Sequence, residues 1–138
     1  MVLIKNSIYF RKISEWDQWL EKNHNTETEI WLVLYKKSTG KPTLNYNETV
    51  ETALCFGWID SIVKKIDEER YAQKYTPRKN YKKWSETNVI RIQKLISENR
   101  IRDFELKKIP QSILGNEYFI EKKTSALSRD LEKLLESN

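Results

Sequence analysis

Two small polar residues, Asp60 and Ser61, follow the bulky Trp58 where the sequence changes from helical to strand-like patterning. At such a junction a carboxylate and a hydroxyl can present hydrogen-bonding groups at the edge of a cleft. The same residue types also hydrogen-bond to nearby backbone and cap local structure. Asp60 and Ser61 are therefore candidate binding residues, and a structural cap is the alternative interpretation.

A cationic segment follows, in which Arg78 and Lys79 precede Trp84. The helix expected to begin there adds backbone N–H groups that suit an anion, and a guanidinium suits carboxylates and phosphates. Arg78 could instead pair with Asp60 or Asp67 and fix the architecture. The candidate site, for an anionic ligand or one with a polar carbonyl group, comprises Trp58, Asp60, Ser61, Tyr71, Arg78, Lys79, Trp84, Ser85 and Asn88.

An enzymatic alternative uses Asp60, Ser61 and Arg78 as acid–base and anion-stabilising groups. Other nucleophiles are weaker candidates. Cys55 falls at the end of an expected helix, where the dipole disfavours a thiolate, and this favours a buried structural role. The single histidine, His24, lies in a polar loop far along the chain from that cysteine. No catalytic residue is therefore assigned from the sequence.

Motifs for cofactors and metals are missing from the sequence. One cysteine and one histidine offer no structural zinc cluster. No GxxxxGK[ST], GxGxxG, HExxH or GxSxG string occurs, and three glycines leave little material for phosphate-cradling loops. The sequence predicts no cofactor and no metal, and it argues against nucleotide hydrolysis and dinucleotide redox chemistry.

The distribution of charge suggests a third function. Lys plus Arg number 25 against 20 Asp plus Glu, a formal net charge of +5, and the excess lies between Lys64 and Lys94. Such an excess attracts nucleic acid or anionic surfaces, although a charge this small also simply keeps a protein in solution. Weak nucleic-acid binding would use Lys64, Lys65, Lys74, Arg78, Lys79, Lys82 and Lys83, with Tyr75, Tyr81 and Trp84 for stacking.

Hydrophobic periodicity predicts the elements that position these residues. A short strand is expected around 8–10, followed by a helix over about 15–22 with Ser14 as its capping residue. Residues 28–35 are apolar on both alternating faces, which indicates a central strand covered on each side.

Further along, Asn45 signals the start of a second helix and Gly57 its end. Alternating residues over 58–66 and 71–76 predict an antiparallel hairpin, whose acidic turn is opened by Asp67. A long amphipathic helix is expected to begin after Ser85 as its N-cap.

Together these elements predict an α+β fold with a small antiparallel sheet, made of the central strand and the hairpin, packed with about three to four helices. Residues 1–100 would form the core domain, and 101–138 a C-terminal extension with a short helix over 128–135. Neither a membrane-spanning run nor a signal-peptide core occurs, and a single cysteine suits a reducing compartment. We expect a cytoplasmic domain that binds a small ligand or a protein partner, without membrane insertion.

Several ordered blocks carry a family resemblance. The string ALCFGWIDS at 53–61 resembles the signature of the bacterial YdeI/OmpD-associated proteins, also called the bacteriocin-protection family. DEERY at 67–71, YTPRK at 75–79, and Trp84-Ser85 with Asn88 and Arg91 are similar to its later blocks in the same order. Two positions depart from the pattern: Lys82 stands where members commonly have Ser, and Asn99-Arg100-Ile101 where they have a Gly-rich segment.

The resemblance implies a role in bacterial resistance to bacteriocins or antimicrobial peptides and an association with outer-membrane porin biology, without an established chemical reaction. Members commonly continue into a helical C-terminal module whose beginning looks like 131–138, so we expect this chain to stop short of that module. The leading hypothesis is a non-catalytic cytoplasmic binding domain in a stress or envelope-resistance pathway.

Overall fold

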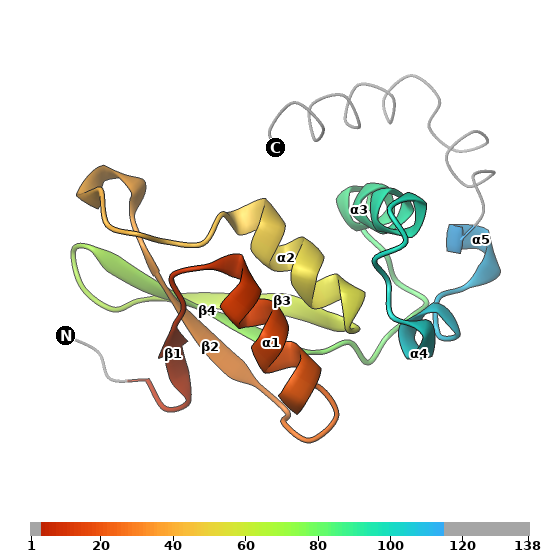
Figure 1. Cartoon of the computed structure of the whole chain (residues 1–138), viewed down its shortest axis with the longest axis horizontal. Helices are drawn as coiled ribbons and strands as arrows, with labels where there is room; N and C mark the ends of the chain where they lie inside the picture. The colour runs from red at the N-terminus through yellow and green to blue at the C-terminus, as the bar shows by residue number, and fades with distance from the viewer. Residues whose placement is uncertain (1–3, 115–138) are drawn as a thin grey trace. The chain divides into compact units, whose positions relative to one another are not determined.

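The computed structural model describes residues 4–114 (Figure 1). The chain divides into two compact units, Met1–Arg78 (unit 1) and Lys79–Asn138 (unit 2), and each is described by itself. The division follows Arg78, whereas the sequence suggested a core domain of residues 1–100 with an extension from 101. The short helix expected over 128–135 lies outside the described residues.

Unit 1 is built on a four-stranded sheet in the order β1-β2-β4-β3. The strands are β1 (Ser7–Tyr9), β2 (Ile30–Tyr35), β3 (Trp58–Lys65) and β4 (Arg70–Pro77). The β3–β4 hairpin is antiparallel, and β4 pairs antiparallel with β2, the strand that contains Trp31. The predicted α+β class with a small sheet is therefore confirmed.

The first strand makes the sheet mixed rather than wholly antiparallel, because β1 runs parallel to β2. A parallel pair needs a crossover connection, and α1 (Ile13–Asn23) supplies it between these strands. The sequence pattern predicted a short strand near this position but not its direction. A strand of three residues is too short for its sequence to indicate a direction. The direction of β1 relative to β2 therefore depends on the helical crossover between them.

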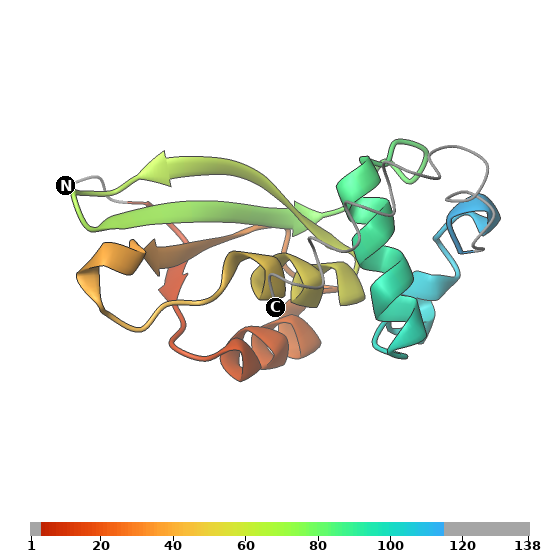
Figure 2. The same cartoon turned by 90° about the horizontal axis from the view of Figure 1, so that it is seen from above.

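Two helices, α1 and α2 (Tyr46–Cys55), lie on the same side of the sheet, as Figure 2 shows. The Trp16 ring of α1 lies 5.3 Å from the Tyr75 ring of β4. Alternate residues of β2 are buried on this side, namely Ile30, Leu32 and Leu34. Burying side chains of this size stabilises the fold by roughly 1.5–3 kcal/mol each. We call this side of the sheet the covered face.

The opposite side, the open face, is covered by no helix within the described part of unit 1 (Figure 2). Trp31 of β2 belongs to this side and is still only 6% exposed. It packs with Ile66, Ala72, Ile4 and Val33. The central strand is thus apolar on both faces as predicted, but single side chains rather than a second layer of helices cover its outer face.

The first helix begins differently from the prediction. It starts at Ile13, and the carboxylate of Glu15 accepts the backbone N–H groups of Arg11 and Lys12 at 2.8 and 3.0 Å. Ser14 lies inside the helix, so its prediction as the capping residue is wrong. The carboxylate satisfies N–H groups at the helix start and takes over the role expected of the serine hydroxyl.

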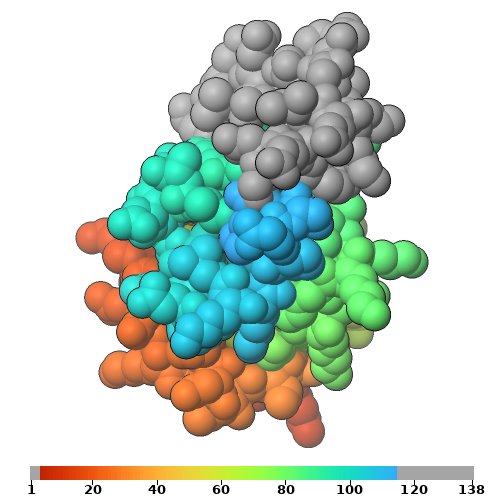
Figure 3. All heavy atoms as spheres, turned by 90° about the vertical axis from the view of Figure 1, so that its right-hand side faces the viewer, coloured from red at the N-terminus to blue at the C-terminus, as the bar shows by residue number. Residues whose placement is uncertain are grey.

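Unit 2, in its described residues, consists of α3 (Glu86–Ser97), α4 (Asp103–Leu106) and α5 (Gln111–Leu114). The Ser85 hydroxyl accepts the N–H of Asn88 at 3.1 Å, which confirms the predicted N-cap. Figure 3 shows the atoms of the segment that holds α4 and α5 on the surface of this unit. Among the residues of unit 2 up to 114, the buried apolar ones are Val89, Ile90, Ile92, Leu95, Ile101, Ile109 and Ile113.

Other helix ends follow their sequence signals. The Asn45 side chain accepts the N–H of Glu48 at 3.1 Å and caps α2. Gly57, just after α2, has a φ of 78°, a left-handed conformation that glycine adopts without strain. Asn99 follows α3 with a φ of 60°, so asparagine serves here where the resemblance led us to expect glycine.

Candidate functional site

The candidate site of unit 1 is centred on Asp60, where β3 is irregular. Asp60 pairs with Tyr75, and Val63 pairs with Gln73, so three steps along β3 lie opposite two along β4. This is a β-bulge, which bends a strand, re-aims side chains and recurs beside functional sites. The bulge leaves Ser61 exposed and keeps Val63 on the same face as Asp60.

A chain of hydrogen bonds runs from Asp60 into the core. The Tyr46 hydroxyl and the Gln73 side-chain amide both donate to Oδ2 of Asp60, at 3.0 and 3.2 Å. The carbonyl of that amide accepts the Tyr75 hydroxyl at 3.4 Å. Because Gln73 is only 3% exposed, both ends of its amide need partners inside the protein. Tyr46, Asp60, Gln73 and Tyr75 are called the Asp60 network below.

Both donors reach the same oxygen of Asp60, and the other oxygen, Oδ1, accepts no hydrogen bond from residues 4–114. The Asp60 side chain is half-buried. Beside it, Tyr46 is 46% exposed and Val63 59% exposed. An oriented carboxylate oxygen next to aromatic and aliphatic surface can accept a hydrogen bond from an amide or ammonium group.

Trp58, another predicted site residue, belongs to the core. It is buried, and its indole N–H donates to the backbone oxygen of His24 at 3.2 Å. The His24 ring lies 5.5 Å from the ring of Phe56, and its Nδ1 lies 2.8 Å from the backbone oxygen of Leu20. Cys55 is buried at the end of α2. Trp58, His24 and Cys55 therefore have structural contacts in unit 1.

Tyr71 and Arg78 lie away from the bulge along β4. Tyr71 is four positions from Tyr75, the pairing partner of Asp60, which is about 13 Å along a strand. Arg78 follows the last residue of β4, and its backbone N–H donates to the oxygen of Gly57 at 2.8 Å. The hairpin register therefore brings Asp60 to the bulge and places Tyr71 toward the turn.

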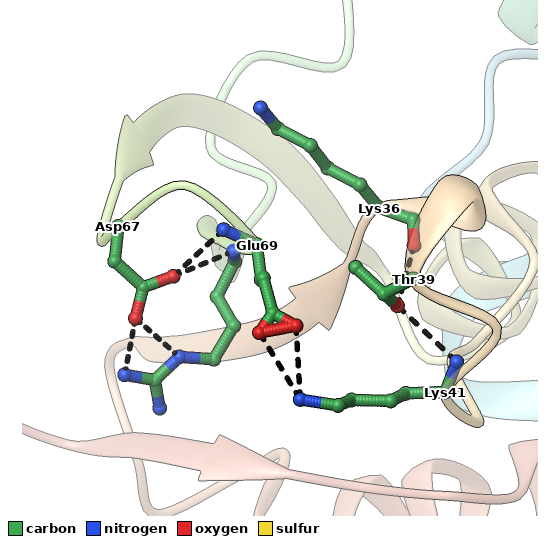
Figure 4. Close-up of polar contacts among 6 residues, drawn as sticks. Lys36, Thr39, Lys41, Asp67 and Glu69 are labelled. Atoms are coloured by element: carbon green, nitrogen blue, oxygen red, sulfur yellow. Dashed lines mark hydrogen bonds and ion pairs between the residues drawn. The ribbon is translucent and has the colours of Figure 1, made fainter.

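The hairpin turn confirms the expected role of Asp67 (Figure 4). Its Oδ1 accepts the backbone N–H groups of Glu69 and Arg70 at 3.0 and 2.8 Å. Its Oδ2 accepts the Arg70 guanidinium at 2.7 Å, and this hydrogen bond lowers the pKa of Asp67 to about 2. Among residues 4–114, Arg78 donates to neither Asp67 nor Asp60, so its predicted pairing with either is wrong.

The predicted site residues of unit 2 lie around the start of α3. Lys79 is exposed. The Trp84 indole N–H donates to the backbone oxygen of Tyr81 at 2.7 Å. The Asn88 side-chain oxygen accepts the Arg91 guanidinium at 3.0 Å. These contacts are local to unit 2, and each side chain supports the segment from which it comes.

The open face carries a second feature, in which cations lie over an aromatic ring. The ammonium groups of Lys64 and Lys74 lie 5.4 and 5.8 Å from the centre of the Trp31 ring. Lys74 also pairs with Glu29 at 3.4 Å. Both lysines belong to the predicted nucleic-acid set, whereas Tyr75, expected to stack on bases, is fully buried. The predicted stacking role of Tyr75 is therefore wrong.

The Asp60 network does not include Ser61, the hydroxyl proposed beside it from the sequence. Ser61 is not among the groups that hydrogen-bond to Asp60, so the carboxylate does not activate it as a nucleophile.

Over residues 4–114, no group of three or more His, Cys, Asp or Glu side chains is arranged to hold a metal ion. In the same range, no helix is both long and apolar enough to cross a membrane.

Sequence reasoning missed Tyr46 in the candidate site. Helical periodicity puts Tyr46 on the same helical face as Val50, Ala53 and Leu54, and this pattern does not indicate a binding role. A tyrosine in the first turn of a helix can keep its hydroxyl at the surface while its ring covers apolar atoms. That position was the available signal, but the partner of the hydroxyl, Asp60, is on another element.

Comparison with known proteins corrects the family resemblance. Residues 8–108 match the family described as Domain of unknown function (DUF8412). No curated protein and no solved structure matches the chain. The resemblance to YdeI/OmpD-associated proteins is therefore wrong, because short blocks were read as a family signature without the positions between them. The role in bacteriocin resistance that it implied loses its basis.

Proposed function

We propose that this chain, which belongs to the DUF8412 family, is a non-catalytic binding domain whose ligand donates a hydrogen bond to Oδ1 of Asp60. One observation carries the proposal. Tyr46 and Gln73 hold the carboxylate through Oδ2, and Oδ1 accepts no hydrogen bond within residues 4–114. A carboxylate already held in place loses little side-chain freedom when a ligand binds.

The charge of Asp60 selects the class of ligand. An anion would be repelled, so the anionic ligand expected for the larger predicted site does not suit this carboxylate. An amide N–H or an ammonium group can donate to it, and such charge-assisted bonds contribute about 1.5–3 kcal/mol. The apolar part of the ligand would lie on the exposed surfaces of Tyr46 and Val63.

The proposal includes a cytoplasmic location. The chain has one cysteine, and Cys55 is buried. A domain that relies on no internal disulfide suits a reducing compartment.

The test is an amide NMR titration of the full chain with n-butylammonium chloride and N-methylacetamide, and with sodium butyrate as the charge-reversed control. We expect the first two probes to shift the amide signals of Asp60, Val63 and Gln73, while butyrate does not. Asp60→Asn keeps the size of the side chain and removes its charge, and it should abolish the response to n-butylammonium.

Glu68→Gln is the matched control, because it removes one carboxylate from the exposed hairpin turn, where Glu68 pairs with Lys65 at 2.9 Å. It should leave the titration unchanged. Equal responses in wild type and Asp60→Asn, or a response to butyrate at these residues, would contradict the proposal.

A further inference from the structure

The open face of the sheet gathers two positive charges over one ring. Lys64 and Lys74 reach the Trp31 indole from neighbouring strands, with their ammonium groups 5.4 and 5.8 Å from its centre. The attraction of the ring for cations favours both contacts despite the repulsion between the two charges. The ring therefore brings both charges to the same part of the open face.

The charges of this pair are only partly neutralised. Glu29 pairs with Lys74 at 3.4 Å. Lys64 contacts no carboxylate anywhere in the described residues and is exposed. An anion placed between the two ammonium groups would relieve their repulsion and gain attraction from both. A phosphate is the biological anion that suits such a pair.

Aromatic surface lies beside this charge pair on the same face. Tyr9 of β1 pairs with Val33 of β2. Val33 is two positions from Trp31, a rise of about 7 Å along the strand. The Tyr9 ring meets the ring of Tyr35 edge-on at 5.3 Å and is 37% exposed. Tyr9 therefore offers exposed ring surface on the same face of the sheet as the two lysines.

A third lysine borders this aromatic pair. The ammonium group of Lys41 lies 5.0 Å from the centre of the Tyr35 ring and pairs with Glu69 at 3.0 Å (Figure 4). The Thr39 hydroxyl oxygen accepts the backbone N–H of Lys41 at 3.2 Å and donates to the backbone oxygen of Lys36. Since Glu69 neutralises its charge, Lys41 contributes a packing contact with Tyr35 and little net charge.

We propose that the open face binds single-stranded nucleic acid, with Lys64 and Lys74 on a phosphodiester group and Tyr9 against a base. Exposed sheet faces that combine cations with aromatic rings bind single strands because every base has a face that can stack. This site goes beyond the function proposed above, since it lies on the opposite side of the hairpin from Asp60.

The test is fluorescence anisotropy of the full chain with a labelled oligothymidylate of about twelve nucleotides, at salt concentrations from about 50 to about 200 mM. We expect Lys64→Gln/Lys74→Gln to weaken binding roughly tenfold at the lowest salt and to flatten the plot of log affinity against log salt by about 1.4. Tyr9→Leu should weaken binding at least about fivefold, since it removes a stacking surface.

The matched control is Lys12→Gln/Lys22→Gln, which removes the same charge from exposed positions at the start and end of α1, on the covered side. It should leave the affinity within about twofold. Thermal melts of all variants report whether each one folds.

Three outcomes would overturn the proposal. They are absence of wild-type binding at the lowest salt, equal losses in both double-lysine variants, and a Tyr9→Leu variant that binds as tightly as wild type. The last, together with competition by inorganic pyrophosphate, would identify a site for phosphate groups that does not recognise bases.

Discussion

The two faces of the β3–β4 hairpin carry opposite chemistry. On the covered face, a carboxylate is held by donors from Tyr46 and Gln73, and a hydrogen-bonded amide continues inward to Tyr75. On the open face, the ammonium groups of Lys64 and Lys74 lie over the Trp31 ring. Alternating residues of the same strands therefore present an acceptor on one side and cations on the other.

The two faces differ in how their polar side chains are stabilised. Under the helices, a polar side chain must find specific partners, so Gln73 is hydrogen-bonded at both ends of its amide. On the open face, long lysine side chains cover the aromatic ring with their stems and keep their charges near water. The covered face is therefore expected to be rigid and selective, and the open face adaptable and sensitive to salt.

The largest expected effect is a difference in the free energy of unfolding between substitutions on the two faces. Leu32→Ala removes a fully buried side chain from the covered face and should lower the free energy of unfolding by about 3 kcal/mol. Val33→Ala changes a half-buried neighbour on the open face and should cost about 1 kcal/mol. Urea unfolding followed by circular dichroism measures both. Equal losses would mean that the open face is as deeply packed as the covered one.

A smaller effect is expected inside the Asp60 network. Gln73→Leu removes a donor to Asp60 and the acceptor that the amide offers to the Tyr75 hydroxyl, and should cost about 1–2 kcal/mol. Tyr75→Phe should cost less in the Gln73→Leu background than in wild type, because the hydrogen bond between the two side chains is already gone. A double variant that loses the sum of the two single changes would show that the hydrogen bond contributes nothing.

The hairpin turn, which joins the two faces, gives a dependence on pH. The hydrogen bond from Arg70 lowers the pKa of Asp67 from 3.8 to about 2, so the ionised form is favoured in the folded state. This contribution to stability is present above pH 4 and is lost as the pH falls toward 2. Asp67→Asn should therefore be less stable than wild type near neutral pH, and the difference should shrink as the pH falls below 4 and vanish below pH 2. A difference that stays constant over this range would contradict the assignment.

The smallest expected effect is on the open face. Lys64→Gln removes one cation from above the Trp31 ring and should cost no more than about 0.5–1 kcal/mol, because the contact is exposed. It should also shift the NMR signal of the Trp31 indole N–H. Lys65→Gln is the control, since Lys65 pairs with Glu68 in the turn. An indole signal that moves equally in both variants would show that the cation–ring contact is not specific.

Local signals accounted for much of the fold. Capping by Asn45 and Ser85 depends on side chains three residues from the N–H groups they accept, so sequence spacing was sufficient. The Asp67 turn is local in the same way. The alternation of β4 likewise predicted a strand. Each of these features involves residues close in sequence, whose geometry follows from helical or strand period.

The candidate site was only partly predictable. Asp60 and Ser61 were identified by residue type, but the donors to Asp60 were not, because Tyr46 and Gln73 are 14 and 13 residues away and lie on other elements. The bulge at Asp60 arises from the pairing of β3 with β4, and no residue type in β3 predicts it. Tyr71 and Asp60 were placed in one predicted site, and the hairpin register separates them along the strands.

By itself, the sequence determined the class of the fold, the positions of the main helices and strands, and the polar residues at the junction of α2 and β3. Only the tertiary structure decided that β1 runs parallel to β2, that Oδ2 rather than Oδ1 of Asp60 accepts the hydrogen bonds of Tyr46 and Gln73, and that Lys64 and Lys74 share the Trp31 ring. The physical reason is that period and capping act over a few residues. Pairing register and side-chain contacts depend on which elements pack together.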